Sequence, residues 1–446
     1  MNLVLFRAAI IAALGGLLFG FDTAVISGTT DQLRSVFDLT PNTLGFTVAS
    51  ALLGTILGAM LAGRPSDKLG RRTTLIWIAV FYFASALGSA LAWDWYSFLL
   101  FRLVGGLGVG ASSVVAPTYI AEISPARYRG RLVALTQFNI VAGILMAYVS
   151  NYGITQFELG PAAWRLMFGV EALPAALFFV LLFATPLSPR WLVTQQRSDE
   201  AIAVLRSLGA VSAEKEVSEI EQSLALERHR LEEPLFQKAY RKPILLAIAI
   251  ATFNQLSGIN ALMYYAPQIF EMAGAGEGSA LLQAVAVGGT NLIFTMAGLA
   301  VIDHLGRRAL MIVGSIGYIV SITATAAAFY TYGTNFDDFG GIVVLVSLLV
   351  FIASHALGQG AVIWVFLSET FPTRVRARGQ ALGSFTHWFF AALVSWTFPI
   401  IAEVSGGHTF AFYAVMMVAQ LIWVLRVMPE TKGVPLEEIQ KRLGIE

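Results

Sequence analysis

The chain has 446 residues, of which 57% are hydrophobic and only 13% are charged, and its mean hydropathy is +0.70. This composition excludes an ordinary soluble domain and indicates a membrane protein. The net charge of +1 gives no reason to expect a nucleic-acid partner, and a chain without cysteine has neither disulfides nor thiolate chemistry.

Apolar segments of roughly 20 residues, each long enough to cross a bilayer, recur along the chain. The first follows Arg7 and continues without a small-residue cleavage site, so we interpret it as an uncleaved span rather than a signal peptide. The sequence therefore predicts an all-α membrane protein with twelve transmembrane helices. The twelve segments lie near residues 6–27, 44–63, 73–92, 97–118, 131–152, 164–185, 243–270, 280–302, 309–330, 341–367, 380–402 and 407–428.

One long polar interruption separates the spans into two sets of six. Its acidic and basic residues balance, and residues 199–206 have the amphipathic spacing of a surface helix. The expected domains are an amino-terminal six-helix half (1–185), a cytoplasmic helical linker (186–242), a carboxy-terminal six-helix half (243–428) and a cytoplasmic tail (429–446).

The positions of the basic residues predict the orientation of the chain. Of the 29 Lys and Arg residues, all except Arg34, Arg102 and Arg165 fall on the cytoplasmic side if both termini are cytoplasmic. We therefore expect a multi-pass protein of the plasma membrane, or inner membrane in a bacterium, with both termini inside the cell.

A loop sequence repeats between the two halves. Residues 67–72 (DKLGRR) follow the second span and reappear as 303–308 (DHLGRR) after the eighth. An acid and two arginines after the fourth span recur loosely after the tenth. The two halves therefore share one plan, as expected of a transporter that moves around a midplane site.

These repeated charges predict a cytoplasmic gate. An arginine after the second or eighth span can form a bidentate pair with a glutamate at the end of a neighbouring span. Such pairs would hold the cytoplasmic side shut and break when it opens. The alternative is that the arginines only set the topology. The candidate gate residues are Asp67, Arg71, Arg72, Glu122, Arg129, Asp303, Arg307, Arg308, Glu369 and Arg376.

The most informative stretch, residues 253–267, places amides and tyrosines inside the seventh span. Buried amides are costly in hydrocarbon unless they face a partner helix or a watery cavity. Gly258 and Pro267 interrupt the helix, which is tolerated where backbone lines a cavity. Amides beside aromatic rings suit a neutral, polyhydroxylated ligand, and the alternative is polar contact between helices.

A carboxylate also lies inside the first span. Asp22 needs a compensating cation in this apolar setting, and Arg102 of the fourth span can supply it. The pair would couple proton binding to helix movement, whereas the alternative is a structural ion pair that never titrates.

Several motifs together resemble the sugar porter family of the major facilitator superfamily, and the resemblance covers the whole chain. One departure is Leu187, in Pro186-Leu187-Ser188, where the family usually has Glu. The motifs are Gly63-x-x-x-Asp67-x-x-Gly70-Arg71-Arg72, Arg102-x-x-Gly105-Gly106-x-Gly108-x-Gly110, Pro117-x-Tyr119-Ile120-Ala121-Glu122, Gln255-x-x-Gly258-x-Asn260-x-x-x-Tyr264-Tyr265-Ala266-Pro267 and Pro429-Glu430-Thr431-Lys432-Gly433.

The resemblance implies the major facilitator fold and a set of sugar ligands. Positions that hydrogen-bond or stack on sugar in the family match Gln137, Gln255, Asn260, Asn291 and Trp364. Asn254 stands where many members have a second Gln. Proton-coupled members have Asp at the position of Asp22, and passive animal facilitators typically have Asn.

Two histidines are a less common feature of the predicted site. His355 precedes the Gly358-Gln359-Gly360 break of the tenth span, and His387 precedes Trp388. This pattern resembles the animal fructose facilitator, and it favours a ketohexose; glucose and xylose members usually differ at both places. The alternative for each histidine is an interhelical hydrogen bond.

The sequence therefore predicts a proton-coupled monosaccharide symporter that works by alternating access, with a hexose, fructose among the candidates, as its substrate. A passive uniporter of the same fold, glucose or xylose as the substrate, and a sugar-sensing receptor are the alternatives. No nucleophile–base set appears, so an enzyme is not expected. No metal or cofactor is expected either, and the predicted partners are the sugar, protons and the lipid bilayer, with the protein as a monomer.

Overall fold

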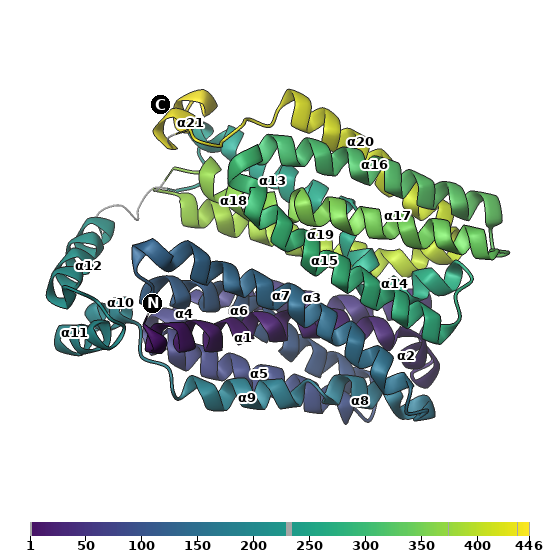
Figure 1. Ribbon diagram of the computed structural model, residues 1–446, viewed down its shortest axis with the longest axis horizontal. Helices are drawn as coiled ribbons and strands as arrows, with labels where there is room; N and C mark the ends of the chain where they lie inside the picture. Colours follow the sequence, from purple (N-terminus) through teal and green to yellow (C-terminus); the bar gives the residue numbers. More distant parts are fainter. Residues whose placement is uncertain (1, 229–233, 373, 435, 446) are drawn as a thin grey trace. The chain divides into compact units, whose positions relative to one another are not determined.

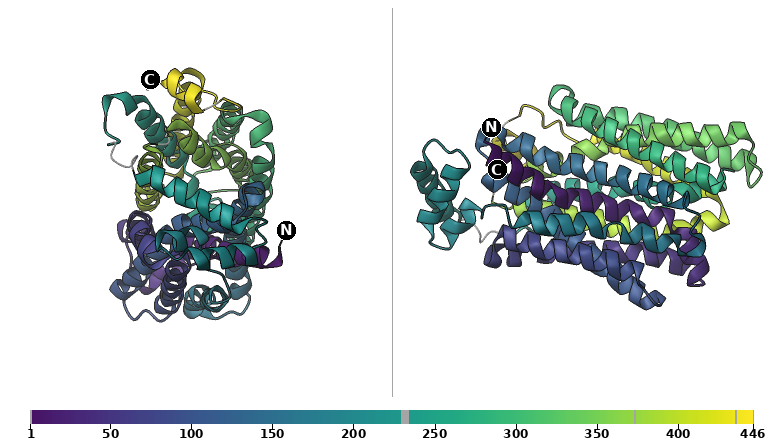
Figure 2. Two further views of the ribbon diagram at one scale, coloured as in Figure 1. Left: turned by 90° about the vertical axis from the view of Figure 1, so that its left-hand side faces the viewer. Right: turned by 60° about the horizontal axis from the view of Figure 1, so that its bottom comes forward.

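The computed structural model describes residues 2–228, 234–372, 374–434 and 436–445. Every regular element in these residues is helical, and twelve of the helical segments are long and apolar enough to cross a membrane. The predicted all-α class and the twelve spans are therefore confirmed. Within each of its two compact units, the long helices run side by side as a bundle (Figures 1 and 2).

The first unit comprises residues 1–25, 50–147 and 162–232. Its transmembrane part packs around a core that includes Tyr82, Tyr119 and Phe178. Its helices are α1 (Leu3–Val25), the later part of α3 (Pro41–Leu61), α4 (Gly63–Leu69), α5 (Arg71–Ala90), α6 (Trp95–Ile123), most of α7 (Ala126–Thr155), α8 (Ala163–Gly169), α9 (Ala172–Leu182), α10 (Pro189–Thr194), α11 (Ser198–Ser207) and α12 (Ala213–Arg228).

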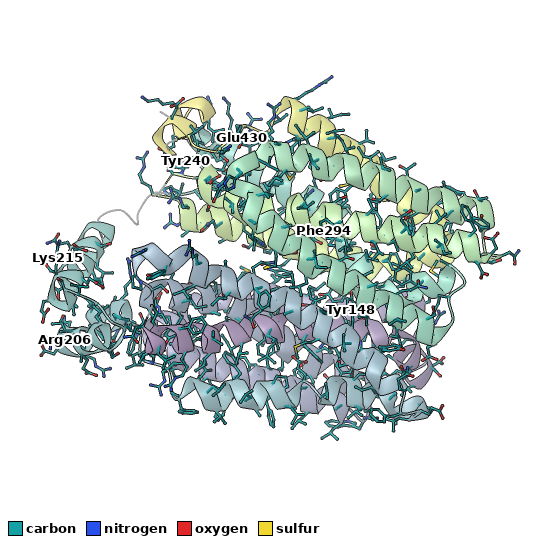
Figure 3. All side chains as sticks on the ribbon, viewed as in Figure 1. Tyr148, Arg206, Lys215, Tyr240, Phe294 and Glu430 are labelled. Atoms are coloured by element: carbon teal, nitrogen blue, oxygen red, sulfur yellow. The ribbon has the colours of Figure 1, made fainter. Side chains whose placement is uncertain are left out.

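The second unit comprises residues 26–49, 148–161 and 233–446. The two short segments join it through contacts such as that of Tyr148, whose hydroxyl donates to the Met263 carbonyl at 2.7 Å (Figure 3). Its elements are η1 (Ile26–Gly28), α2 (Thr30–Val36), η2 (Gly160–Ala162, at the border of the two units), η3 (Lys238–Tyr240), α13 (Arg241–Leu256), α14 (Ile259–Met272), α15 (Glu277–Leu305), α16 (Arg307–Tyr332), α17 (Asp338–Leu357), α18 (Gln359–Thr370), α19 (Arg376–Val404), α20 (Gly406–Arg426) and α21 (Leu436–Leu443).

Glycines let helices of the first unit touch backbone to backbone. A Cβ on Gly20 of α1 would lie 1.9 Å from the carbonyl oxygen of Ile140, and one on Gly143 of α7 would lie 2.0 Å from that of Leu17. Gly106 of α6 makes the same close approach to α3, with the Ala51 oxygen 1.9 Å from its Cβ position. Small residues allow this packing where lipid supplies no hydrophobic driving force between helices. We call these contacts the glycine seams.

Three spans are broken, and two of the breaks were expected from sequence. The seventh divides into α13 and α14 at Gly258, whose φ of +88° is left-handed, and a Cβ there would lie 2.6 Å from the Tyr413 ring. The tenth divides into α17 and α18 at Gly358. The sixth divides into α8 and α9 beside Glu171, which the sequence did not predict.

The linker is helical, as predicted, in the part of it that the structure describes; residues 229–233 lie outside that part. The Ser188 hydroxyl accepts from the backbone N–H of Trp191 and so caps α10, and Pro189 occupies its first turn. Helices α10, α11 and α12 lie together (Figure 1). They share a small apolar cluster that includes Trp191 and Leu205. The indole Nε1 of Trp191 donates to the Asp67 carbonyl at 3.0 Å, which joins the linker to the end of α4.

Candidate functional site

A buried ion pair lies in the first unit. Arg102 of α6 donates from Nη1 to Asp22 Oδ1 at 2.6 Å and from Nη2 to the Asp22 carbonyl oxygen at 3.2 Å. Both side chains are almost fully buried, with 1% and 2% of their surface exposed. The Arg102 guanidinium also lies 5.2 Å from the centre of the Phe168 ring. Such a pair is stable in a low dielectric only while both partners stay charged.

Glu171 is the third charged residue of this region. It lies at the break between α8 and α9, is 1% exposed, and interacts electrostatically with both Asp22 and Arg102. Neither of its carboxylate oxygens has a hydrogen-bond partner among the described residues. Two carboxyl groups thus face one guanidinium, and a fully ionised set would bury one uncompensated negative charge. We call Asp22, Arg102 and Glu171 the charged cluster.

Sequence reasoning did not single out Glu171. The signal was nevertheless present, because a lone carboxylate inside an apolar span is the feature that drew attention to Asp22.

A neutral group of polar and aromatic side chains lies in the second unit. The Gln255 amide nitrogen is 3.1 Å from Asn254 Oδ1 and 3.1 Å from His387 Nε2. The His387 ring centre is 5.1 Å from that of Trp364 and 4.9 Å from that of Trp388. We call these five residues, from α13, α18 and α19, the amide cluster.

The amide cluster has the chemistry to hold a hydroxylated ligand. Gln255 is 1% exposed, yet its Oε1 has no partner among the described residues. A buried carbonyl oxygen of this kind favours a donor such as a hydroxyl group. Trp364 is 40% exposed and offers an aromatic face beside the His387 ring.

The other predicted ligands lie at different places in the structure. Asn291 of α15 is buried and accepts from the Thr295 hydroxyl at 3.3 Å, and Asn260 lies on the first turn of α14. His355 receives a close contact from the Tyr318 hydroxyl, 2.5 Å from its Nδ1, so an interhelical hydrogen bond uses this ring nitrogen. Gln137 lies on α7, in the part that belongs to the first unit.

A network of polar contacts lies at the start of α5. Arg71 Nε is 2.9 Å from Glu122 Oε2, and its Nη1 is 3.1 Å from Asp67 Oδ1. The Ser188 hydroxyl donates to Glu122 from the linker side. We call this the first network.

The second unit holds the equivalent network at the start of α16. Arg307 donates to Glu369 from two nitrogens, Nη2 at 2.8 Å and Nε at 3.2 Å, and from Nη1 to Asp303 at 3.1 Å. The Thr431 hydroxyl donates to Glu369 at 2.6 Å, as Ser188 does to Glu122. We call this the second network.

Glu430, labelled in Figure 3, completes the second network. Its carboxylate accepts from the backbone N–H groups of Arg307 at 3.1 Å and Arg308 at 3.0 Å, the first two residues of α16. Partial burial opposes its ionisation, but backbone N–H groups of Lys432, Arg308, Arg307 and Thr431 lower the pKa of Glu430. The carboxylate therefore acts as an N-terminal cap.

Three of the remaining predicted gate residues, Arg72, Arg308 and Arg376, donate to backbone carbonyls. Arg72 donates to the Phe183 carbonyl, and Arg308 donates to the carbonyls of Val424 and Leu425, so both fasten helix ends rather than a glutamate side chain. Arg376 donates to the Phe371 carbonyl, and Arg129 is exposed. In the described part of the chain, no group of three or more His, Asp or Glu side chains is placed to hold a metal.

Comparison with known proteins identifies the family. The family described as "Sugar (and other) transporter" matches residues 8–443. The chain is 38% identical to the D-xylose-proton symporter of Escherichia coli strain K12, over 98% of this chain and 95% of that protein. It is 34% identical to the arabinose-proton symporter of Bacillus subtilis strain 168, over 96% of this chain and 93% of that protein.

Solved structures agree with these relatives. The inward-open structure of the xylose transporter XylE from E. coli has a TM-score of 0.87 and 37% identity, and the match covers 98% of this chain and 99% of that one. The structure of the same proton:xylose symporter bound to 6-bromo-6-deoxy-D-glucose has a TM-score of 0.77. The fold is therefore that of the major facilitator superfamily, and the chain belongs to its sugar transporter family, whose members are transporters and not enzymes.

Proposed function

We propose that this protein is a proton-coupled monosaccharide symporter that works by alternating access. The charged cluster is the observation that carries the proposal, because it holds two carboxyl groups and one guanidinium away from water. Two of the similar proteins are described as proton symporters of pentoses, D-xylose and arabinose. We also propose that the protein acts as a monomer in the cell membrane with both termini cytoplasmic, in agreement with the positions of its basic residues.

The charged cluster favours the binding of one proton. An unpaired buried charge is costly, so Asp22 and Glu171 are easier to accommodate when one of them is protonated. If Asp22 takes the proton, its attraction to Arg102 weakens, and α1 can move relative to α6. Proton binding and sugar binding would then be linked, because both shift the equilibrium between the same conformations.

Replacing Asp22 by Asn tests this coupling. The Asp22→Asn variant should lose uphill sugar accumulation and sugar-driven proton uptake, yet retain sugar binding and the exchange of labelled for unlabelled sugar. Both can be measured in proteoliposomes with a pH indicator and radiolabelled sugar. Accumulation by this variant against a gradient would overturn the symporter proposal, and a wild-type protein that never accumulates sugar would establish a passive uniporter.

Glu171→Gln is the matched test of the second carboxyl group. The change removes the competing negative charge and leaves the Asp22–Arg102 pair intact. We expect proton-driven uptake to continue, because Asp22 still offers a carboxyl group beside Arg102. Loss of proton-driven uptake in Glu171→Gln would contradict the assignment of proton binding to Asp22.

The amide cluster is the proposed sugar site, with Asn260 and Asn291 of the same unit as further ligands. Gln137, which belongs to the first unit, stays a ligand predicted from sequence. Gln255→Ala should weaken sugar binding by roughly fivefold or more, since one net hydrogen bond is worth about 1 kcal/mol. Binding can be measured by calorimetry on the purified protein. Ser347→Ala, which changes a residue of α17 outside the amide cluster, is the control and should keep the wild-type sugar affinity. Wild-type affinity in Gln255→Ala would reject this site.

The identity of the sugar stays a prediction. A fructose preference rests on His355 and His387, and of the two only His387 lies in the amide cluster. Competition of unlabelled D-xylose, L-arabinose, D-glucose and D-fructose against uptake measures the preference directly. Competition by fructose that weakens in His387→Asn would support the ketohexose, whereas competition by the pentoses alone would reject it.

A further inference from the structure

A chain of buried amides joins three helices of the second unit at the break in the tenth span. Gln359, the first residue of α18, is fully buried and donates from Nε2 to the Gln420 Oε1 of α20. The Gln420 Nε2 in turn donates to the Ser315 hydroxyl of α16 at 2.8 Å. The Ser315 hydroxyl donates a hydrogen bond to the Met311 carbonyl oxygen at 2.7 Å. We call Gln359, Gln420 and Ser315 the amide clasp.

The backbones of α16 and α18 are also in close contact at the amide clasp. Gly358, between α17 and α18, has φ −89° and ψ −100°, outside the helical region. A Cβ added to Gly314 of α16 would lie 3.0 Å from the Gly358 Cα. The start of α18 is therefore held against α16 through backbone packing and through the amide chain.

The other end of α18 is held to α16 by charge. Glu369 lies ten positions after Gln359, or about 15 Å along the helix axis, and Arg307 holds it. Its side chain is 21% exposed, whereas Gln359 and Gln420 are 0% exposed. Water can replace the partners of the exposed carboxylate, but nothing replaces the partners of a buried amide. The two attachments thus differ in how readily they can open.

We propose that the amide clasp is the pivot of α18. Gln359 and Gln420 are positioning residues that keep the start of this helix in place while its Arg307–Glu369 end opens and closes. Trp364 lies between the two ends, with its ring centre 5.1 Å from that of His387. The clasp therefore limits how far Trp364 can move relative to Gln255 and His387, two other members of the amide cluster, during the cycle. The pivot is tested through the KM of sugar uptake, so this inference rests on the proposed transport of a monosaccharide.

A double-variant cycle separates positioning from stability. Gln359→Leu alone leaves the Gln420 oxygen buried without a donor, so both the melting temperature and transport should fall. In the Gln359→Leu/Gln420→Leu protein two apolar side chains replace the pair, and the unsatisfied amide is gone. Ser315 keeps its bond to Met311. The melting temperature should then recover.

The sugar KM should not recover in the double variant. With α18 no longer anchored, we expect KM to stay raised on the order of fivefold, the factor given by one lost hydrogen bond. Gln283→Leu, an amide removed from the exposed side of α15, is the matched control and should keep the wild-type KM. Uptake of the sugar that competes best with the wild type supplies the measurement.

A double variant with wild-type melting temperature and wild-type KM would overturn the pivot. So would single variants whose KM stays normal while only stability falls. A wild-type protein that transports none of the four sugars would reject the proposed function instead, and the two failures are therefore distinguishable.

Discussion

The two networks at the starts of α5 and α16 occupy equivalent positions in the repeated sequence, yet they are built differently. Arg71 meets Glu122 through one nitrogen, whereas Arg307 meets Glu369 through two. In the second network Glu430 also caps the helix that Arg307 begins. The corresponding position of the first network is Leu187, whose side chain cannot accept a hydrogen bond.

In the first unit an aromatic ring, rather than a carboxylate, covers the glycine that precedes the helix. Gly70 and Gly306, which precede the two helices, have similar left-handed φ values of +87° and +93°. The Trp191 indole covers Gly70, 3.0 Å from the position of a Cβ, and Glu430 covers Gly306 at 2.7 Å. A repeated sequence thus preserves the arginine and the glycine while the group that closes the loop differs. The second network depends more on charge and the first more on packing.

The largest expected effect comes from Arg307→Ala. It removes the bidentate contact and leaves Glu369 partly buried beside Thr431, which should cost about 2 to 4 kcal/mol. If the network is a gate, turnover should fall more than sugar affinity. Thermal unfolding measures the loss of stability, and uptake kinetics give turnover and sugar affinity. Single-cysteine accessibility in this cysteine-free chain reports whether the cytoplasmic side opens.

Arg71→Ala is the partner experiment and should cost less, because Arg71 makes a single-nitrogen contact and Ser188 still donates to Glu122. Equal losses of stability in the two variants would mean that the second nitrogen of Arg307 contributes nothing to the stability of the second network. Unchanged accessibility in both would leave these arginines as topology signals.

Glu430→Gln should have an intermediate effect. An amide accepts more weakly than a carboxylate from the N–H groups of Arg307 and Arg308, so we expect a loss of about 1 kcal/mol. Leu187→Gln is the matched change in the first network, where no N-terminal cap is lost.

The same residue gives a pH dependence with a definite sign. The folded protein lowers the pKa of Glu430 below its ordinary value of 4.5. The stabilisation is therefore complete above that value and is lost as the pH falls through the lower folded pKa. The difference in melting temperature between wild type and Glu430→Gln should shrink on acidification, and a constant difference would contradict the capping role.

The smallest effect is expected from Leu187→Glu, which places the missing carboxylate in the first network. Because Trp191 already covers Gly70, the gain should be at most about 0.5 kcal/mol. Differential scanning of the two proteins measures it. A gain as large as the loss in Glu430→Gln would show that packing by Trp191 does not substitute for charge.

Much of this architecture follows from hydropathy and spacing. The twelve spans were predictable because each must satisfy its own backbone in lipid, and the breaks at Gly258 and Gly358 because glycine weakens a helix. The repeated loop pointed to arginines that meet Glu122 and Glu369. These features depend on local sequence.

What sequence reasoning missed depends on partners distant in the chain. Glu171 and Gln420 stand alone in apolar spans, and their meaning appears only beside Arg102 and Gln359. Residues 26–49 pack with the second unit although they follow the first span. Arg72 and Arg308 recur in the repeated loop beside Arg71 and Arg307, which pair with the glutamates. Each of them instead donates to a backbone carbonyl, because the neighbouring arginine already binds the glutamate.

The glycine seams of the first unit have a consequence for engineering. Replacing a helical glycine by alanine usually stabilises a helix by about 0.5 to 1 kcal/mol. At Gly20, Gly106 or Gly143 the added methyl group would overlap a carbonyl oxygen of the neighbouring helix. A screen for stabilising substitutions that scores each helix in isolation would therefore select changes that force the packed helices apart. Libraries for this transporter should keep the seams fixed and seek gains at surface positions such as those of α11 and α12.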